Sequence, residues 1–260
     1  MEERAWVQSA SPEDLELFSS LRGRRHPEGR FIGDGDKVVR RMLERTKVER
    51  ILCTADWVER LPIPPGIDVR IAPKSELFAI VGFRLHQGLM ALGVVPPEKP
   101  LSGTFHVALD GLANAENVGA ILRTCAAFGV DGVLLGPGTA SPWLRRAVRV
   151  SLGAPLVVPL HTSADLAASV SSLNAYAAHI HGEKRDYRSI DYRQPVCLVL
   201  GSEPLGVTEP VLRASKGVIY IPMATEWDCL NVAASAAVLL SEVRRQRSRW
   251  TPPGEAPPAT

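Results

Sequence analysis

The residue types that most often carry out chemistry are sparse and scattered in this chain of 260 residues. Its four cysteines lie far apart and form no C-x-x-C pair, which argues against a zinc site and against a disulfide framework. His179 and His181 flank Ile180 without a third ligand nearby, a pattern more typical of a strand end than of a metal centre. We therefore expect no bound metal and a reduced, cytoplasmic protein.

Phosphate-binding loops and hydrolase motifs find no better support. Gly136-Pro137-Gly138 is the nearest approach to a dinucleotide-binding loop, but Pro137 has no amide N–H to offer a phosphate. The sequence contains neither a P-loop Gly-Lys-Ser/Thr nor a G-x-S-x-G elbow. Dinucleotide-dependent, P-loop and serine-hydrolase chemistry are therefore disfavoured.

The best candidate for a binding site lies within residues 198–247. Two apolar runs, Val196–Leu200 and Val218–Ile221, read as buried strands, and each ends in a cluster of turn-forming residues. An alanine-rich helix follows from about Asn231. Because ligands of α/β proteins collect where parallel strands end, these two loops and the helix predict one ligand site.

A basic segment near the N-terminus is the second candidate. Residues 21–50 hold ten Lys or Arg against five Asp or Glu, and the glycine-rich loop 22–30 should be exposed. Such a patch is an electrostatic footprint for phosphate backbones, although a solvated face explains it about equally well. The candidate phosphate-binding residues are Arg22, Arg24, Arg25 and Arg30.

The elements that must hold these residues alternate between strand and helix along the chain, which indicates an α/β fold. We expect a small α/β unit before the proline-rich segment 95–100, where we place a domain boundary, and a βαβ unit after it. In that unit Asn114 or Asn117 caps a helix that ends at Gly129. The tail 251–260 is expected to be disordered. Further expected strands span 50–54, 68–72, 104–109, 130–135 and 175–180, and residues 151–160 lead into a strand that ends near Pro159. Further expected helices span 36–44, 75–80 (capped by Ser75), 141–150 and 163–173.

Three sub-sequences at strand ends resemble, in order and spacing, the three motifs of the SpoU (TrmH-like) RNA ribose 2′-O-methyltransferases of the SPOUT class. They are Asn117-Val118-Gly119-x-x-x-Arg123, Leu200-Gly201-Ser202-Glu203-x-x-Gly206, and Ile221-Pro222-Met223 followed by Leu230-Asn231-Val232. The resemblance implies an α/β trefoil-knot domain over 101–250, an exception to the rule that chains are unknotted. Residues 1–97 more loosely resemble an L30e/L7Ae-like α/β domain that binds the RNA substrate.

The resemblance also implies S-adenosylmethionine as cofactor, held in the knot largely by backbone groups. This explains why the matching positions are chemically plain, since Gly201 lets the main chain approach a ligand closely. The implied cofactor-binding residues are Leu200, Gly201, Gly206, Ile221, Met223 and Leu230.

Arg123 is the residue that the resemblance brings to the reacting ribose hydroxyl. A guanidinium is a poor base, with a pKa above about 12, so an electrostatic role is preferred over proton abstraction. Asn117 and Glu203 are expected to orient Arg123 and the loops, and Asn231 to cap the last helix.

The third motif departs from the family pattern, because Cys229 and Ala233 stand where serines are common. This leaves open a non-catalytic RNA-binding protein that keeps the knotted fold. The implied partners are RNA, ribosomal before transfer RNA, and a second copy of the chain bound through the knot domain. No apolar run approaches the ~18 residues of a membrane span, and the N-terminus is too charged for a signal peptide.

Overall fold

The computed structural model describes residues 7–20, 29–81, 87–180, 183–202, 205–224 and 230–247. Several residues singled out above fall outside these ranges, so the structure does not test their predicted roles. They are Arg22, Arg24, Arg25, His181, Glu203, Cys229 and the tail 251–260.

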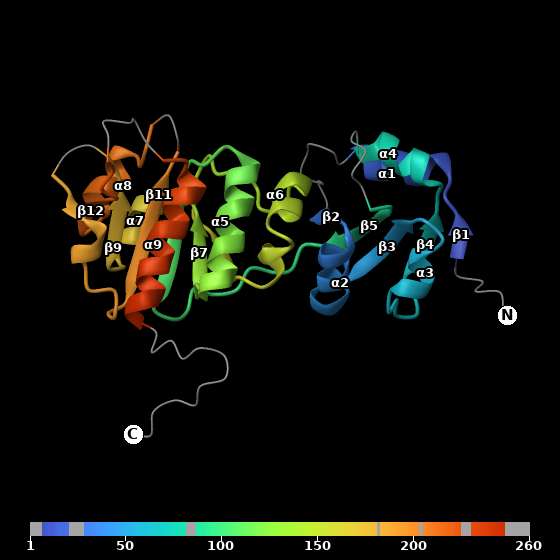
Figure 1. Ribbon diagram of the computed structural model, residues 1–260, viewed down its shortest axis with the longest axis horizontal. Coiled ribbons are helices and arrows are strands. Elements are labelled where there is room, and N and C mark those ends of the chain that lie inside the picture. Colours follow the sequence, from blue (N-terminus) through green and yellow to red (C-terminus); the bar gives the residue numbers. More distant parts are fainter. Residues whose placement is uncertain are drawn as a thin grey trace, which may run out of the picture.

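The N-terminal part folds around a five-stranded mixed sheet with helices on both faces (Figure 1). Successive residues of one strand point to opposite faces, so Phe31 belongs to one apolar cluster and Ile32 to the other. Helices α1 (Pro12–Ser20) and α4 (Lys74–Val81) cover the Ile32 face, and α2 (Asp36–Arg45) and α3 (Trp57–Arg60) cover the Phe31 face. In spatial order the strands are β1 (Val7–Ser9), β4 (Asp68–Ile71), β3 (Val48–Cys53), β5 (Leu89–Val94) and β2 (Arg30–Asp34), with β5 antiparallel to both neighbours.

The C-terminal part is a seven-stranded, wholly parallel sheet between two helical layers. Helices α5 (Ala115–Phe128) and α9 (Val232–Arg247) pack side by side on one face, while α7 (Leu166–Ser171) and α8 (Glu209–Ala214) cover the other (Figure 1). In spatial order the strands are β10 (Arg185–Asp186), β12 (Gly217–Tyr220), β9 (Ala175–Ala178), β11 (Val196–Gly201), β6 (Phe105–Asp110), β7 (Gly132–Leu135) and β8 (Leu160–Thr162).

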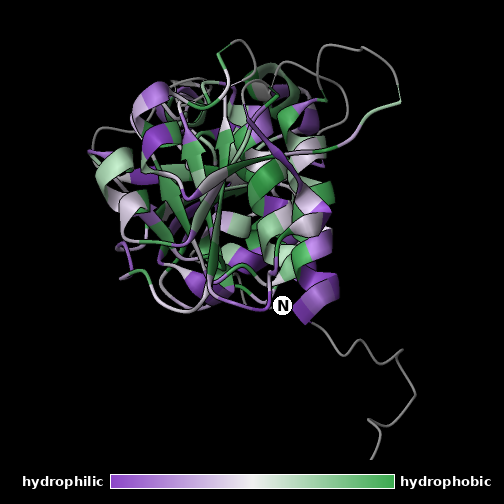
Figure 2. Cartoon of the chain, turned by 90° about the vertical axis from the view of Figure 1, so that its left-hand side faces the viewer, coloured by the Kyte–Doolittle hydropathy of each residue, from purple (hydrophilic) through white to green (hydrophobic). Residues whose placement is uncertain are grey.

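The central strands are fully buried because helices cover both faces of the sheet. Every residue of β6 and of β11 is buried, as continuous apolar runs predict for parallel strands. Figure 2 shows the hydrophobic strands inside and hydrophilic residues on the outer helices. The expected α/β architecture is thus confirmed. The L30e-like character of the N-terminal part, the knot and the domain limits 1–97 and 101–250 stay predictions.

The predicted βαβ unit has its expected caps. The Asn114 side chain accepts from the amides of Glu116 and Asn117, and Gly129 ends α5 with a left-handed φ of 70°. No helix in the described ranges is long and apolar enough to cross a membrane.

Three predicted elements were wrong in detail. Helix α4 begins at Lys74, so Ser75 lies inside it, and the helix expected from residue 141 begins only with α6 (Arg145–Val150). The strand expected to end near Pro159 begins only after it, at Leu160, and the residues before it form turns and a short 3-10 helix, Ala154–Leu156. The cause is Pro155 and Pro159, which lack the amide donors that a strand needs.

Candidate functional site

A cavity of about 380 Å³ lies beyond the carboxyl ends of β9, β11 and β12, at one end of the parallel sheet. All six residues proposed from sequence to bind a cofactor line it, although they come from three separate segments. Ten further lining residues were not predicted. Three of them could have been inferred from the expected strand end at 178–180. These ten are Ala178, His179, Ile180, Ser202, Leu205, Ile219, Tyr220, Val232, Ser235 and Leu239.

The loop after β11 forms one wall, and its shape depends on two glycines. Ser202 and Gly206 pair in both directions, with N–O distances of 3.1 and 2.8 Å. A Cβ on Gly201 would lie 2.1 Å from the carbonyl carbon of Gly206, so the main chain crosses itself there without room for a side chain. Gly206 has a φ of +69°, and a Cβ on it would meet the His179 ring at 2.5 Å. At Gly201 and Gly206, therefore, the chain presents backbone rather than side chains to the cavity.

A buried carboxylate anchors the far end of this loop. Asp110, the last residue of β6, is 5% exposed and accepts a hydrogen bond of 2.7 Å from the Thr208 amide. Its strand position pairs with Gly201 of β11. Asp110 thus holds the loop against the sheet edge, a role that the sequence analysis did not predict.

Two of the four predicted catalytic residues meet beside the cavity. The Asn231 side chain donates to the Asn117 side-chain oxygen at 3.2 Å, which joins the start of α9 to the start of α5. The Asn231 oxygen also accepts from the amides of Ala233 and Ala234, so it caps α9 as expected. Asn231 lies between Leu230 and Val232, which both line the cavity.

Arg123 lies apart from this pair. It is exposed on α5, six residues after Asn117, and six helical steps of about 100° put the two side chains on different sides of the helix. Arg123 is not among the residues that line the cavity. Within one chain, therefore, the structure joins the predicted cofactor residues to Asn117 and Asn231 but not to Arg123.

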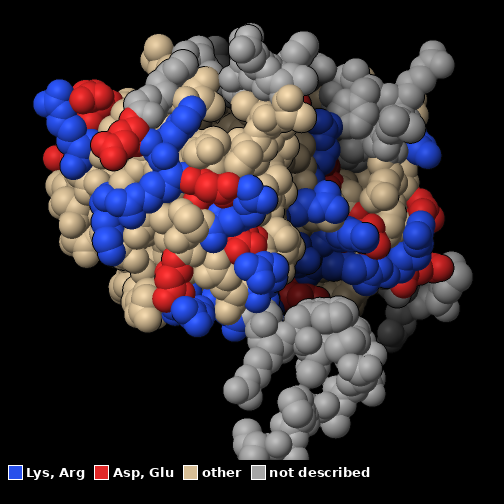
Figure 3. Space-filling view, turned by 60° about the vertical axis from the view of Figure 1, so that its left-hand side comes forward, with Lys and Arg blue, Asp and Glu red and all other residues tan. Residues whose placement is uncertain are grey.

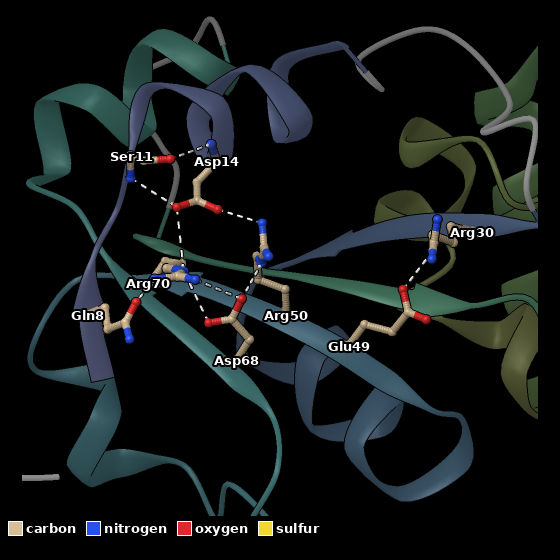
Figure 4. A network of polar contacts seen from close by, with 8 residues as sticks. All are labelled: Gln8, Ser11, Asp14, Arg30, Glu49, Arg50, Asp68 and Arg70. Atoms are coloured by element: carbon tan, nitrogen blue, oxygen red, sulfur yellow. Dashed lines mark hydrogen bonds and ion pairs between the residues drawn. The ribbon is translucent and has the colours of Figure 1, made fainter. Parts of the chain in front are cut away.

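In the described part of the basic segment, from residue 29 on, several arginines are engaged in ion pairs. Arg30 lies 2.6 Å from Glu49, and Arg50 contacts both Asp14 and Asp68 in a network that also holds Arg70 (Figure 4). Figure 3, which brings the C-terminal part forward, shows Lys and Arg interleaved with Asp and Glu on that side of the molecule. Asp14 and Asp68 lie outside residues 21–50, so the count along the sequence overstates the charge that the described part of this segment presents to a polyanion.

The described cysteines are free thiols buried in the hydrophobic core. Burial raises the pKa of Cys53 and of Cys197 to about 12, and it raises the pKa of Cys125 further, so these thiols stay protonated at neutral pH. In the ranges that the structure describes, no group of three or more His, Cys, Asp or Glu is arranged to hold a metal ion.

Comparison with known proteins identifies the family. The SpoU rRNA Methylase family matches residues 104–241, more than half of the chain. An uncharacterized tRNA/rRNA methyltransferase of Mycobacterium bovis is 34% identical over 180 residues, which are 64% of this chain and 62% of that protein. The match thus spans under two thirds of the relative's length.

Solved structures agree with this match. A protein assigned to the TrmH family of RNA methyltransferases, from Porphyromonas gingivalis, superposes with a TM-score of 0.79 at 29% identity, over 91% of this chain and 99% of that one. An rRNA methyltransferase from Sinorhizobium meliloti, solved with AdoMet bound, shares the fold with a TM-score of 0.80 at 24% identity over 93% and 98% of the two chains. The resemblance drawn from the three motifs is confirmed: the chain belongs to the SpoU rRNA Methylase family.

Proposed function

We propose that this protein transfers a methyl group from S-adenosylmethionine to a ribose 2′-hydroxyl of RNA, ribosomal RNA before transfer RNA, in the cytoplasm. One observation carries the proposal: residues of the second and third motifs line a single cavity, and the Asn117–Asn231 contact ties the first motif to its rim.

The cavity suits this cofactor. Its volume of about 380 Å³ falls in the range of small-molecule sites, and its lining is mainly apolar with a few polar groups. The close crossing at Gly201 would let the main chain approach a ligand closely, and main-chain amides and carbonyls are groups that can hydrogen-bond an adenine edge. Ile221 and Leu230 would wall the base with their side chains. The related protein of Sinorhizobium meliloti holds AdoMet.

When bound, S-adenosylmethionine supplies a methyl group that is already activated by its sulfonium. The protein's own residues would then have to position the ribose and assist the loss of the hydroxyl proton, so that the 2′-oxygen could accept the methyl group. The Asn117–Asn231 contact fixes the starts of α5 and α9 around this point. The Arg123 guanidinium would hold a target phosphate and stabilise the forming alkoxide, and Glu203 would help to orient it.

Because Arg123 does not line the cavity of its own chain, we further propose that it acts in a homodimer, on RNA bound at the partner copy's site. Small residues, Ala126 on α5 and Ala234 on α9, are exposed on the helical layer that carries Arg123, which suits close packing of a second copy. A complementation experiment tests this idea. At a cofactor concentration too low to fill the Gly201→Ala site, mixed dimers of Arg123→Ala and Gly201→Ala chains should be more active than either variant alone if Arg123 acts across the interface. They should gain no activity if Arg123 acts within one chain.

Tritiated methyl transfer to total RNA from a strain lacking the gene tests the activity itself. Undiminished transfer by Arg123→Ala would remove this residue from the mechanism. The rival function, RNA binding without catalysis, is favoured by Ala233, which offers no hydroxyl where serine is common. It predicts no binding of S-adenosylmethionine or sinefungin in calorimetry. Reverse-transcription stops at low nucleotide concentration, with and without the gene, would identify the RNA and the nucleotide.

A further inference from the structure

A buried ion pair joins the two parts of the chain. The Arg145 Nε donates to Oδ2 of Asp34 at 3.0 Å, and its Nη2 lies 2.9 Å from the same oxygen. The two side chains are only 6% and 4% exposed. Asp34 is the last residue of β2 in the N-terminal sheet, and Arg145 is the first residue of α6 in the C-terminal part.

Further contacts surround this pair. The rings of Phe31 and Trp143 lie 4.9 Å apart, and Val148 of α6 belongs to the apolar cluster of the N-terminal part. Arg41 of α2 donates to the carbonyl of Leu152, and Leu152 is the one non-glycine residue of the described ranges with a positive φ, 54°. A left-handed leucine is strained, so the surrounding contacts must hold it in place.

The opposite side of α6 packs against the helix that carries Asn117 and Arg123. A Cβ on Gly119 of α5 would lie 2.6 Å from the Ala147 carbonyl oxygen, so the two helices touch through their main chains. A cleft of about 680 Å³ opens beside this contact, between residues 113–116 and 144–146. Helix α6 therefore cannot follow a movement of the N-terminal part without changing both the packing on α5 and the shape of the cleft.

We propose that the Asp34–Arg145 pair is a positioning device that fixes the N-terminal part in one orientation relative to α5, so that a bound RNA presents a single ribose to the site. This inference rests on the proposed function. Independent movement is the usual behaviour of two parts joined by a short linker such as 95–100. A buried ion pair opposes such movement, because any other orientation of the N-terminal part would leave one desolvated charge without its partner.

The variants that test the device are Asp34→Asn, Arg145→Met and the double variant. Each single change leaves one buried charge uncompensated, so it destabilises the protein, whereas the double change removes both charges and should recover most of that stability. Asp56→Asn is the matched control, because it breaks an exposed ion pair with Arg60 in the same part of the chain.

If the pair positions RNA, the double variant should bind S-adenosylmethionine with the wild-type Kd but show an apparent KM for total RNA raised about tenfold or more. It should also give new reverse-transcription stops near the original one, while Asp56→Asn matches the wild type. If the pair only stabilises the fold, KM and the stop pattern should return to wild type together with stability, and this result would overturn the inference.

Failure of the proposed function is distinguishable from failure of the device. If the wild type neither binds S-adenosylmethionine nor methylates RNA, the function is refuted, and spin labels on α2 and α8 still report on the device through their distance distribution. A narrow distribution in the wild type that broadens in the double variant supports it. Equal widths in the two proteins would refute it.

Discussion

Replacing Gly201 by alanine should weaken cofactor binding while the protein stays folded. An added Cβ would lie 2.1 Å from the carbonyl carbon of Gly206 and 2.2 Å from the amide nitrogen of Val207. Both are main-chain atoms, which cannot turn aside as a flexible side chain can. Ordinary contact begins near 3.4 Å, so the loop must move by about 1.3 Å.

A displacement of this size removes hydrogen bonds to a ligand, because a bond of about 2.9 Å would lengthen well beyond 3.5 Å. Two lost bonds at roughly 1–1.5 kcal/mol each amount to about 2–3 kcal/mol, which is a Kd for S-adenosylmethionine about 30- to 150-fold higher. Overpacking should also cost about 1–3 kcal/mol of stability. The expected variant is thus folded, with a lower Tm and weak cofactor binding.

Isothermal titration with S-adenosylmethionine and with sinefungin measures the effect, alongside thermal unfolding. Gly217→Ala is the control, since that glycine lies in the same sheet, has an ordinary φ, and would bring its Cβ only to 3.7 Å from the Tyr176 ring. A folded Gly201→Ala protein that binds the cofactor with the wild-type Kd would refute the assignment of this loop as a cofactor wall.

Three further outcomes are expected. Asn231→Ala should lower stability by about 1 kcal/mol more than Asn117→Ala in thermal unfolding, because Asn231 also caps α9; equal losses would show that the cap contributes nothing. Arg146→Gln, at an exposed residue of the cleft between α5 and α6, should weaken RNA binding and reduce its salt slope by about 1 without changing the cofactor Kd, and an unchanged slope would contradict phosphate contact. The Cys53 and Cys197 thiols have folded-state pKa values raised by burial to about 12, so their stabilising contribution is complete below about pH 9, where unfolded thiols begin to ionise, and is lost as pH rises toward 12. Denaturant midpoints between pH 8 and about 10.5 should fall less steeply in Cys197→Ala than in the wild type, and parallel slopes would contradict this account.

The location of the ligand cavity could be predicted because it depends on local patterns. Continuous apolar runs mark the buried parallel strands, and turn-forming residues mark their carboxyl ends, where the structure has the cavity. The cap at Asn114 and the stop at Gly129 follow the same local rules. His179 was not predicted as a wall residue, because its contact with Gly206 joins two loops that are far apart in sequence.

Charge was the weaker guide, because a count along the sequence does not show which charges meet in space. Arg30 and Arg50 read as contributors to a phosphate-binding patch, yet Glu49 lies against the first and Asp14 and Asp68 against the second. Asp14 and Asp68 lie outside the segment 21–50, on α1 and β4. Their pairing with Arg50 depends on the fold, so a charge count within that segment misses it.

Arg145 shows why this limit matters for function. In sequence it belongs to a basic helix, and nothing in the local pattern distinguishes it from its neighbour Arg146. In the structure Arg145 is buried against Asp34, 111 residues earlier, while Arg146 stays exposed at the cleft. Burial commits the first arginine to holding the N-terminal part and leaves the second accessible to a polyanion. Substitutions at these two adjacent arginines are therefore expected to have different effects. Arg145→Met should alter where RNA is methylated, and Arg146→Gln should alter how strongly RNA binds.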